Sequence, residues 1–127
     1  MPDKHWFEYA VIRWVPRVER EEFLNVGVIV YCAAQQFLRV KYELDEHRLR
    51  AFSAATELED VRANLLALQR ISAGDQKSGP IAFLDTASRF RWLTAVRSTV
   101  VQTSPVHPGL CTDAQVTLEE LFDRLVR

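Results

Sequence analysis

Residues 25–33 (Asn-Val-Gly-Val-Ile-Val-Tyr-Cys-Ala) constrain the fold most, because this run of β-branched and aromatic residues is typical of a β-strand. Three residues, 34–36, separate it from a second strand-like run at 37–42. A connection this short joins two strands as an antiparallel hairpin. The two runs therefore predict the centre of an antiparallel sheet.

Two further segments extend this predicted sheet. Residues 8–15 are rich in β-branched and aromatic types and stop at Pro16, which favours the end of a strand. Residues 98–106 predict a short edge strand, since an edge position tolerates Pro105. We expect three core strands plus this edge strand.

Helical patterns follow in the rest of the chain, with a loop-like stretch at residues 73–80. The first predicted helix covers residues 45–54, with Asp45 as its cap. The second follows the capping box Thr56-Glu57-Leu58-Glu59 and has Val61, Leu65, Leu68 and Ile71 or Ser72 on one stripe. The third runs from Asp85 or Thr86 to Arg97, with Phe90, Leu93 and Val96 facing inward, and the last follows the capping box Thr117-Leu118-Glu119-Glu120, with Leu118, Leu121, Phe122 and Leu125 on one stripe. Strands first and helices later is the order of an α+β fold.

The length and the apolar content indicate one domain. The chain has 127 residues, 48% of them hydrophobic, which is enough for one compact core and too few for two. We predict a single α+β domain over residues 1–127, with three to four helices packed on one face of a small antiparallel sheet.

Strand alternation sorts the predicted sheet into two faces. The face expected to be buried under the helices carries Ala10, Ile12, Trp14, Val26, Val28, Val30, Leu38, Val40 and Tyr42. The opposite, mixed face carries Tyr9, Val11, Arg13, Asn25, Gly27, Ile29, Tyr31, Phe37, Arg39 and Lys41.

Three interpretations of the mixed face stay open. It is covered by another helix, the C-terminal segment or a second subunit, with Lys and Arg stems lying over apolar surface. It is a protein-interaction surface, because interface centres favour aromatic residues and arginine. Or it binds single-stranded nucleic acid, with bases stacked on Tyr9, Tyr31 or Phe37.

A polar group surrounds the connection between the first two strands. Glu22 is placed to pair with Arg13, and Asn25 at the strand start suits a hydrogen bond to nearby backbone. Gly27 weakens a central strand unless a bulge or a bulky neighbour needs the space. A buried network that fixes the loop and an acid–base or ligand-binding role for Glu22 with Arg13 are the two alternatives.

A second basic group, Arg89, Arg91 and Arg97, lies around Trp92 on the third predicted helix. Arg89 lies about one turn before Trp92, so an arginine-on-aromatic contact is feasible. This group is either a solvated helix face or an anion-binding site.

The bulk properties of the chain argue against several classes of function. The 16 Lys and Arg residues balance 17 Asp and Glu residues, which argues against bulk affinity for nucleic acid. The apolar stretch 26–34 is too short to span a membrane, and the start of the chain does not resemble a secretory signal. We expect a cytoplasmic protein with Cys32 and Cys111 reduced.

No pattern in the sequence indicates a metal, a cofactor or a catalytic nucleophile. His5, His47 and His107 lack a carboxylate or cysteine at metal-ligand spacing. Gly-rich phosphate loops and Gly-x-Ser-x-Gly elbows are absent from the sequence. We therefore expect a protein that is not an enzyme.

The chain resembles a bacterial family named domain of unknown function 3037. The resemblance rests on Tyr9-x-x-x-Arg13-x-x-Pro16, Glu22-x-x-Asn25-Val26-Gly27-Val28, Arg89-x-Arg91-Trp92, Gln102 and Leu121-Phe122-x-x-Leu125-Val126. It implies a stand-alone bacterial cytosolic protein, and a partner or modulator role beside kinase-like proteins of the HipA type. It also implies that Arg13, Glu22, Asn25, Gly27 and Arg89 belong to one constellation.

The sequence thus favours a non-enzymatic interaction or regulatory protein that binds a protein partner or itself. The tentative surface comprises Tyr9, Arg13, Glu22, Asn25, Tyr31, Arg39, Lys41, Arg89 and Arg91. The alternative is a nucleic-acid- or nucleotide-binding protein with weak nuclease activity, in which Arg13, Arg39, Lys41 and Arg89 meet phosphates and Glu22 is the acid–base group.

Overall fold

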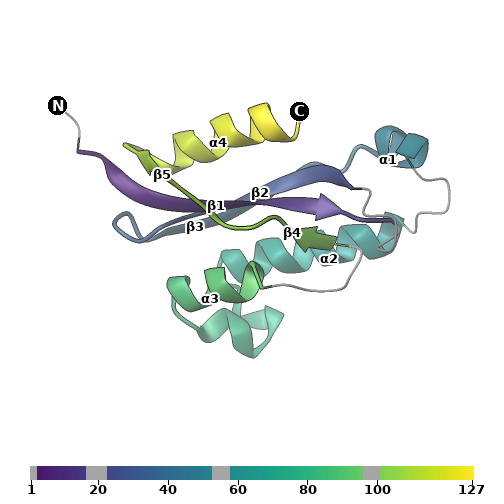
Figure 1. The fold of residues 1–127 in the computed structure, drawn as a ribbon. Helices are drawn as coiled ribbons and strands as arrows, with labels where there is room; N and C mark the ends of the chain where they lie inside the picture. The colour runs from purple at the N-terminus through teal and green to yellow at the C-terminus, as the bar shows by residue number, and fades with distance from the viewer. Residues whose placement is uncertain (1–2, 17–22, 53–57, 96–100) are drawn as a thin grey trace.

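A computed structural model describes residues 3–16, 23–52, 58–95 and 101–127. Its elements are β1 (His5–Trp14), β2 (Leu24–Cys32), β3 (Phe37–Tyr42), α1 (Glu46–Phe52), α2 (Leu58–Ser72), the 3₁₀ helices η2 (Gln76–Ser78) and η3 (Pro80–Phe83), α3 (Thr86–Leu93), β4 (Val101–Thr103), β5 (His107–Cys111) and α4 (Ala114–Leu125). This is a mixed α+β fold (Figure 1).

The sheet is antiparallel and has five strands, so it is larger than the sequence predicts. Its order is β3-β2-β1, and both β4 and β5 pair with the outer side of β1. The predicted edge strand stops too early, because pairing resumes beyond Pro105 and continues to Cys111. At the break, the Ser104 N–H donates to the Val11 carbonyl at 2.8 Å, and the Ser104 hydroxyl accepts from the Val11 N–H at 2.9 Å.

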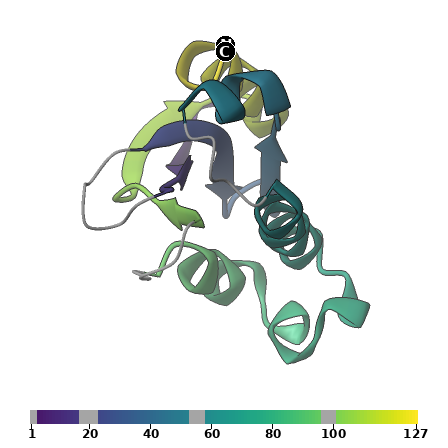
Figure 2. The ribbon, with the colours of Figure 1, turned by 90° about the vertical axis from the view of Figure 1, so that its right-hand side faces the viewer.

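Helices cover both faces of the sheet, so the prediction of helices on one face is wrong. α2 and α3 lie on one side, whereas α4 lies on the other (Figures 1 and 2). Each side has its own core. The first contains Ile12, Trp14, Val26, Ile29, Leu38, Val40 and the inward residues of α2 and α3; the second contains Phe7, Val28, Val30, Cys32, Cys111 and the inward residues of α4.

A bulge in β2 explains the error. Ile12 pairs with Gly27 and Arg13 pairs with Asn25, which leaves Val26 as the extra residue. Val26 therefore joins the α2–α3 core, whereas Val28 and Val30 project towards α4. The same alternation places Ile29 in the α2–α3 core, with Tyr31 packed against it, instead of on the mixed face.

The predicted helices are present, with shifted ends. Asp45 accepts from the Arg48 N–H before α1, and Asp85 accepts from the Ser88 N–H before α3, which ends at Leu93 instead of Arg97. The stripe of α2 is buried, whereas Thr56 and Val96 lie outside the described residues. α4 begins three residues before Thr117, because the Asp113 carboxylate accepts from the Gln115 and Val116 N–H groups and caps the helix first.

Gly27 is needed for space, in agreement with the sequence-based expectation. A Cβ atom at this position would lie 2.7 Å from the Lys41 carbonyl oxygen and 2.9 Å from the Tyr42 Cβ. Both neighbours belong to β3, the strand paired with this part of β2. The close approach of two backbones therefore excludes a side chain here.

We expect Gly27→Ala to destabilise the protein by about 1–3 kcal/mol, because the new methyl group forces β2 and β3 apart. Urea unfolding followed by far-UV circular dichroism measures this change. Val116→Ala on the exposed side of α4 is the control, with an expected change within about 0.5 kcal/mol. Equal stability of Gly27→Ala and the wild type would contradict the close packing of β2 on β3.

Candidate functional site

The sheet divides the residues that the sequence assigns to a functional surface. Tyr9, Arg13, Asn25 and Lys41 belong to the sheet face beneath α4, or to its end. Tyr31 projects to the other face, which also carries α3 with Arg89 and Arg91 (Figure 1). Glu22 lies outside the described residues. A single surface made of all these side chains therefore does not form.

α4 covers the mixed face, as the first of its three interpretations expects for the C-terminal segment. The Lys41 ammonium forms an ion pair with Glu119 and lies 4.6 Å from the centroid of the Phe122 ring. The Tyr9 ring is half-buried and lies 6.0 Å from Phe7 and 5.3 Å from His107, between ring centroids. Both residues thus help to hold α4 and β5 on the sheet.

Asn25 fastens the C-terminal end of α4 to the start of β2. Its side-chain amide donates to the Leu125 carbonyl at 3.1 Å, and the Arg48 guanidinium donates to the next carbonyl, that of Val126, at 3.0 Å. Such bonds satisfy the carbonyls that a helix leaves open at its end. The expected backbone bond of Asn25 exists, but it goes to a helix 100 residues away instead of to the nearby loop.

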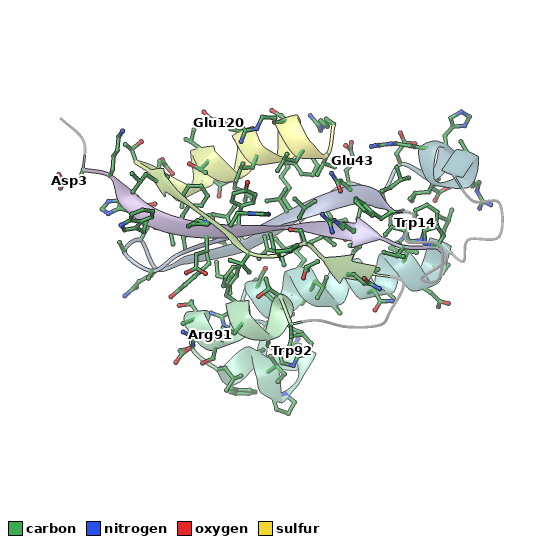
Figure 3. The ribbon with its side chains drawn as sticks, viewed as in Figure 1. Asp3, Trp14, Glu43, Arg91, Trp92 and Glu120 are labelled. Carbon is green, nitrogen blue, oxygen red and sulfur yellow. The ribbon has the colours of Figure 1, made fainter. Side chains whose placement is uncertain are left out.

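A cavity of about 260 Å³ adjoins this helix end. Among its lining residues, the acids Glu43 and Asp45 balance the bases Arg48 and Arg127, and Arg127 forms an ion pair with Glu43 at 3.3 Å. Figure 3 shows Glu43 beside the C-terminal end of α4. The charges around this cavity compensate one another.

Arg13 lies opposite Asn25 in the β1–β2 register, and its guanidinium lies 4.2 Å from the centroid of the Phe23 ring. Its Nε is buried and has no hydrogen-bond partner among the residues that the structure describes. The predicted pairing with Glu22 falls outside the described residues. Arg13 and Asn25 are neighbours, as the family resemblance implies.

Arg89 is separated from that pair by the sheet, so the structure does not bring it into their constellation. Its Nη1 donates to the carbonyls of Ile71 and Ser72, at 2.9 and 3.0 Å, and thereby caps the C-terminal end of α2. Gly74 follows with a φ of 73°, and a Cβ there would lie 3.0 Å from Arg89 Nη1. One nitrogen of the Arg89 guanidinium, Nη1, is thus directed at the end of α2.

Arg39 and Arg89 both belong to the lining of a small cavity between β3, α2 and α3, although the Arg39 guanidinium lies over Phe37, on the α4 side of the sheet. The cavity has a volume of about 140 Å³, and its lining residues are Gln36, Phe37, Leu38, Arg39, Ser72, Ala73, Thr86 and Arg89. A second cavity of about 440 Å³ shares Arg39, Ser72 and Ala73 with it and extends along α2 past Leu66, Gln69, Arg70 and Asp75. We call the two together the Arg39–Arg89 groove.

Arg91 does not line this groove. It is exposed on α3 (Figure 3). The hydrogen bonds from Ser88 hold the pKa of the Asp85 carboxyl below its usual range, and the charges of Arg91 and Arg89 add to that effect. Arg91 therefore supports the start of α3 electrostatically.

Tyr31 is also used inside the fold. Its ring stacks on Phe90 of α3, with a centroid separation of 5.2 Å. The tyrosine therefore holds α3 against β2 and is not part of an open aromatic surface.

One exposed feature escaped the sequence analysis. Trp6 and Leu110 are cross-strand partners of β1 and β5, and they are 70% and 53% exposed. Glu8 and Pro108, the next pair in the register on the same side of the sheet, are exposed as well. We call these four residues the Trp6–Leu110 patch. The only signal in the sequence is an early tryptophan, and nothing local predicts that β5 lies beside it.

The two cysteines lie together in the core beneath α4. Both are free and buried. Burial raises the pKa of the Cys111 thiol, and the neighbouring Cys32 thiol adds to the rise. A raised pKa keeps a thiol protonated and unreactive, which suits a structural role.

The described residues contain no group of three or more His, Cys, Asp or Glu side chains placed to hold a metal ion. None of the helices among them is long and apolar enough to cross a membrane.

A comparison with protein families places the chain. The family model described as Protein of unknown function (DUF3037) matches residues 9–126. The chain belongs to the DUF3037 family. This match confirms the resemblance seen in the sequence. Of the helices and strands described, only the first part of β1 lies outside the matched residues. Searches of curated proteins and of solved structures found no match.

The two arginines of the groove should differ in their effect on the stability of this DUF3037 protein. We expect Arg89→Ala to cost about 1.5–3 kcal/mol, because the α2 carbonyls lose a charged donor. Arg39 is exposed, and its guanidinium carbon lies 5.9 Å from the centroid of the Phe37 ring, so Arg39→Ala should change stability by less than about 0.5 kcal/mol. Thermal unfolding measures both. Equal losses in the two variants would contradict the capping role of Arg89.

The Lys41–Glu119 ion pair should make stability depend on pH. The hydrogen bond from Lys41 lowers the pKa of the Glu119 carboxyl, so the ionised form is favoured by folding. This stabilisation is present above the unfolded pKa of about 4.3 and is lost as the pH falls through the lowered pKa of the folded state. We expect Glu119→Gln to be less stable than the wild type at pH 7, with the difference shrinking at pH 2.5.

Urea unfolding at the two pH values tests this expectation. Glu120→Gln is the matched control, because Glu120 is exposed on the outer side of α4 (Figure 3). The control should show a smaller difference from the wild type at pH 7. A pH-independent effect of Glu119→Gln would show that the ion pair does not stabilise α4.

Proposed function

We propose that this DUF3037 protein is a non-enzymatic interaction or regulatory protein of the bacterial cytoplasm. The observation that supports this function best is the Trp6–Leu110 patch. Large exposed apolar side chains that lie next to one another are a mark of interaction sites, and tryptophan is enriched at the centres of protein interfaces.

The patch lies on open sheet surface. Trp6 projects to the same side of β1 as Ile12, by strand alternation, but it is 70% exposed whereas Ile12 is fully buried. α2 and α3 thus cover the part of this face around Ile12 and leave the part around Trp6, at the start of β1, uncovered. β5 pairs with β1 at this end, and the apolar side chains of the two strands are presented together.

The uses of the other candidate residues also favour a binding protein over an enzyme. Lys41, Asn25 and Tyr31 contact α4 or α3 through their side chains, and Arg89 caps α2. These side chains are engaged in holding helices on the sheet. They are not assembled around a common reaction centre.

The partner we propose is a kinase-like protein of the HipA type, on the basis of the family resemblance. An apolar patch flanked by Glu8 suits a protein surface with apolar character and a basic rim. Self-association through the same patch is the other outcome that a test can reveal.

Nucleic-acid binding by Arg13, Arg39, Lys41 and Arg89 together receives less support. Lys41 is paired with Glu119 beneath α4, and Arg89 lies on the opposite side of the sheet. A long basic track for a nucleic-acid backbone needs such cations on one surface.

The double variant Trp6→Ala/Leu110→Ser tests the proposed function. We expect it to weaken binding to the HipA-type protein of the same organism at least 30-fold or so, since a central tryptophan contributes about 2 kcal/mol or more. Isothermal titration calorimetry gives the affinity, and sedimentation velocity of the protein alone reports self-association.

Phe83→Ser is the matched control, because Phe83 is 65% exposed on η3, outside the patch. It should leave the affinity unchanged. If the double variant binds as tightly as the wild type, and the oligomeric state of the protein is also unchanged, the patch is not the interaction surface.

A further inference from the structure

We propose that the outer edge of β3 binds an extended segment of a partner protein, in which apolar and acidic side chains alternate. The segment adds to the sheet as a further strand. In this mode of recognition, main-chain hydrogen bonds supply affinity and alternate side chains supply specificity. The inference is independent of the Trp6–Leu110 patch, because β3 lies at one edge of the sheet and β5, which carries Leu110, lies at the other, beyond β1.

One hydrogen bond shows which backbone groups of β3 point away from the sheet. The N–H of Glu43, the residue after β3, donates to the Val26 carbonyl at 2.9 Å, so Glu43 directs its backbone groups to β2. Successive residues of an antiparallel strand direct these groups alternately to one side and the other. The outward-facing residues of β3 are therefore Leu38, Val40 and Tyr42. Among the residues that the structure describes, none outside β3 forms a backbone hydrogen bond with these three.

The opposite edge of the sheet is protected against such an addition. The Ser104 N–H donates to the Val11 carbonyl at 2.8 Å, which shows that the odd-numbered residues of β1 face this edge. Their partners on β5 are also odd-numbered, so Pro108 and Leu110 direct their backbone groups outward. A proline has no N–H to donate, and it blocks pairing at a sheet edge. The edge of β3, with three residues that each offer an N–H and a C=O, is the one suited to receive a strand.

A cavity with an apolar wall borders this edge on the α2 side of the sheet. It is the larger cavity of the Arg39–Arg89 groove, about 440 Å³, and Val40 of β3 belongs to its lining. Leu66, Arg70 and Ala73 of α2 also line it, and their spacing of three and four residues places them on one flank of the helix. An added strand lies about 4.7–4.9 Å from β3. Its side chains on this side of the sheet therefore enter the cavity.

The other side of an added strand meets Arg39. The strand register places Arg39 with Lys41 on the α4 side of the sheet, and the Arg39 guanidinium carbon lies 5.9 Å from the centroid of the Phe37 ring. Lys41 is paired with Glu119, whereas Arg39 is exposed and forms no ion pair with a described residue. Opposite charges on neighbouring strands stabilise their pairing. Acidic side chains on the α4 side of the segment thus complement Arg39.

The two sides of this edge therefore differ in charge. On the cavity side, Arg70 and Asp75 balance each other, and the Asp75 carboxylate already accepts from the Lys77 N–H at 3.0 Å. On the α4 side, Arg39 lacks such a counter-charge among the described residues. A segment with apolar residues towards α2 and acidic residues towards α4 matches both sides.

A second copy of the chain fits this edge less well. Antiparallel pairing of two β3 strands centred on Val40 would place Arg39 of each copy opposite Lys41 of the other. Pairing centred on either cation would place that cation opposite itself. Like charges directly opposite one another destabilise a strand pair. The occupant that the charges favour is therefore a different, acidic chain.

A short blocked peptide in which valine and glutamate alternate is the probe, and fluorescence anisotropy with the intact protein measures its binding. We expect it to bind at least about tenfold more tightly than the same peptide with lysine in place of glutamate. Hydrogen exchange followed by NMR should show that the bound peptide protects the amides of Leu38, Val40 and Tyr42. Equal binding of the two peptides, or binding without this protection, would overturn the proposal.

Methylation of the peptide backbone separates strand addition from a general charge effect. In an antiparallel addition the valines lie opposite the outward-facing residues of β3, so their N–H and C=O groups form the hydrogen bonds. N-methylation of two valines should weaken binding at least about tenfold, since two hydrogen bonds are lost. N-methylation of two glutamates is the matched control and should leave the affinity within about threefold. Equal losses in the two peptides would contradict strand addition.

Arg39→Glu is the matching variant of the protein. It should weaken binding of the glutamate peptide at least about tenfold and strengthen binding of the lysine peptide. Arg91→Glu makes the same change of charge on the exposed side of α3 and should leave both affinities unchanged. Equal effects of the two variants would overturn the site at β3.

Two controls identify other occupants. Trp6→Ala/Leu110→Ser should bind the glutamate peptide as the wild type does, so failure of the patch and failure of the β3 edge are distinguishable. A loss of peptide binding in this double variant would place the peptide on the patch. Protection of the β3 edge amides in the protein alone, together with a dimer in sedimentation velocity, would show that a second copy occupies the edge. Either result would overturn the proposal.

Discussion

The bulge at Val26 is the constraint on which the rest of the structure depends. One extra residue in β2 decides which side chains of the central strand meet α2 and α3 and which meet α4. Without it, alternation would bring Val26 to the same side as Val28 and Val30, and Asn25 would no longer face the end of α4. A sheet buried on both sides needs apolar residues on both faces of its central strand, and β2 provides them.

The near-zero net charge of the chain hides two different electrostatic arrangements. On the α4 side, Lys41 pairs with Glu119 and Arg127 pairs with Glu43, so cations there stabilise contacts within the fold. Across the sheet, Arg89 lines a cavity whose lining residues include no carboxylate. The potential at a surface is set by such local groupings, which a count of charged residues averages away.

Local patterns predicted the hairpin of β2 and β3, the buried stripe of α2 and the caps Asp45 and Asp85, because each depends on neighbours within a few residues. They did not predict the partner of β1 beyond Pro105, the early start of α4 at Asp113 or the second covered face. The pairing of β1 and the second covered face depend on contacts over about a hundred residues, whereas the start of α4 is set locally by the Asp113 cap. The candidate site divided in the same way. Arg39 and Arg89 were identified as cations, but Arg39 projects with Lys41 to the α4 side of the sheet, whereas Arg89 lies on α3 at the other side.

The buried thiols of Cys32 and Cys111 provide a way to measure the local opening of α4. Both lie in the core that this helix seals, and neither is accessible to a reagent while the helix is docked. Alkylation of these thiols would then proceed through transient opening of the helix. The rate of alkylation therefore reports the free energy of that local opening, and no label has to be introduced. The native chain thus carries its own kinetic reporter for the element that closes one side of the sheet.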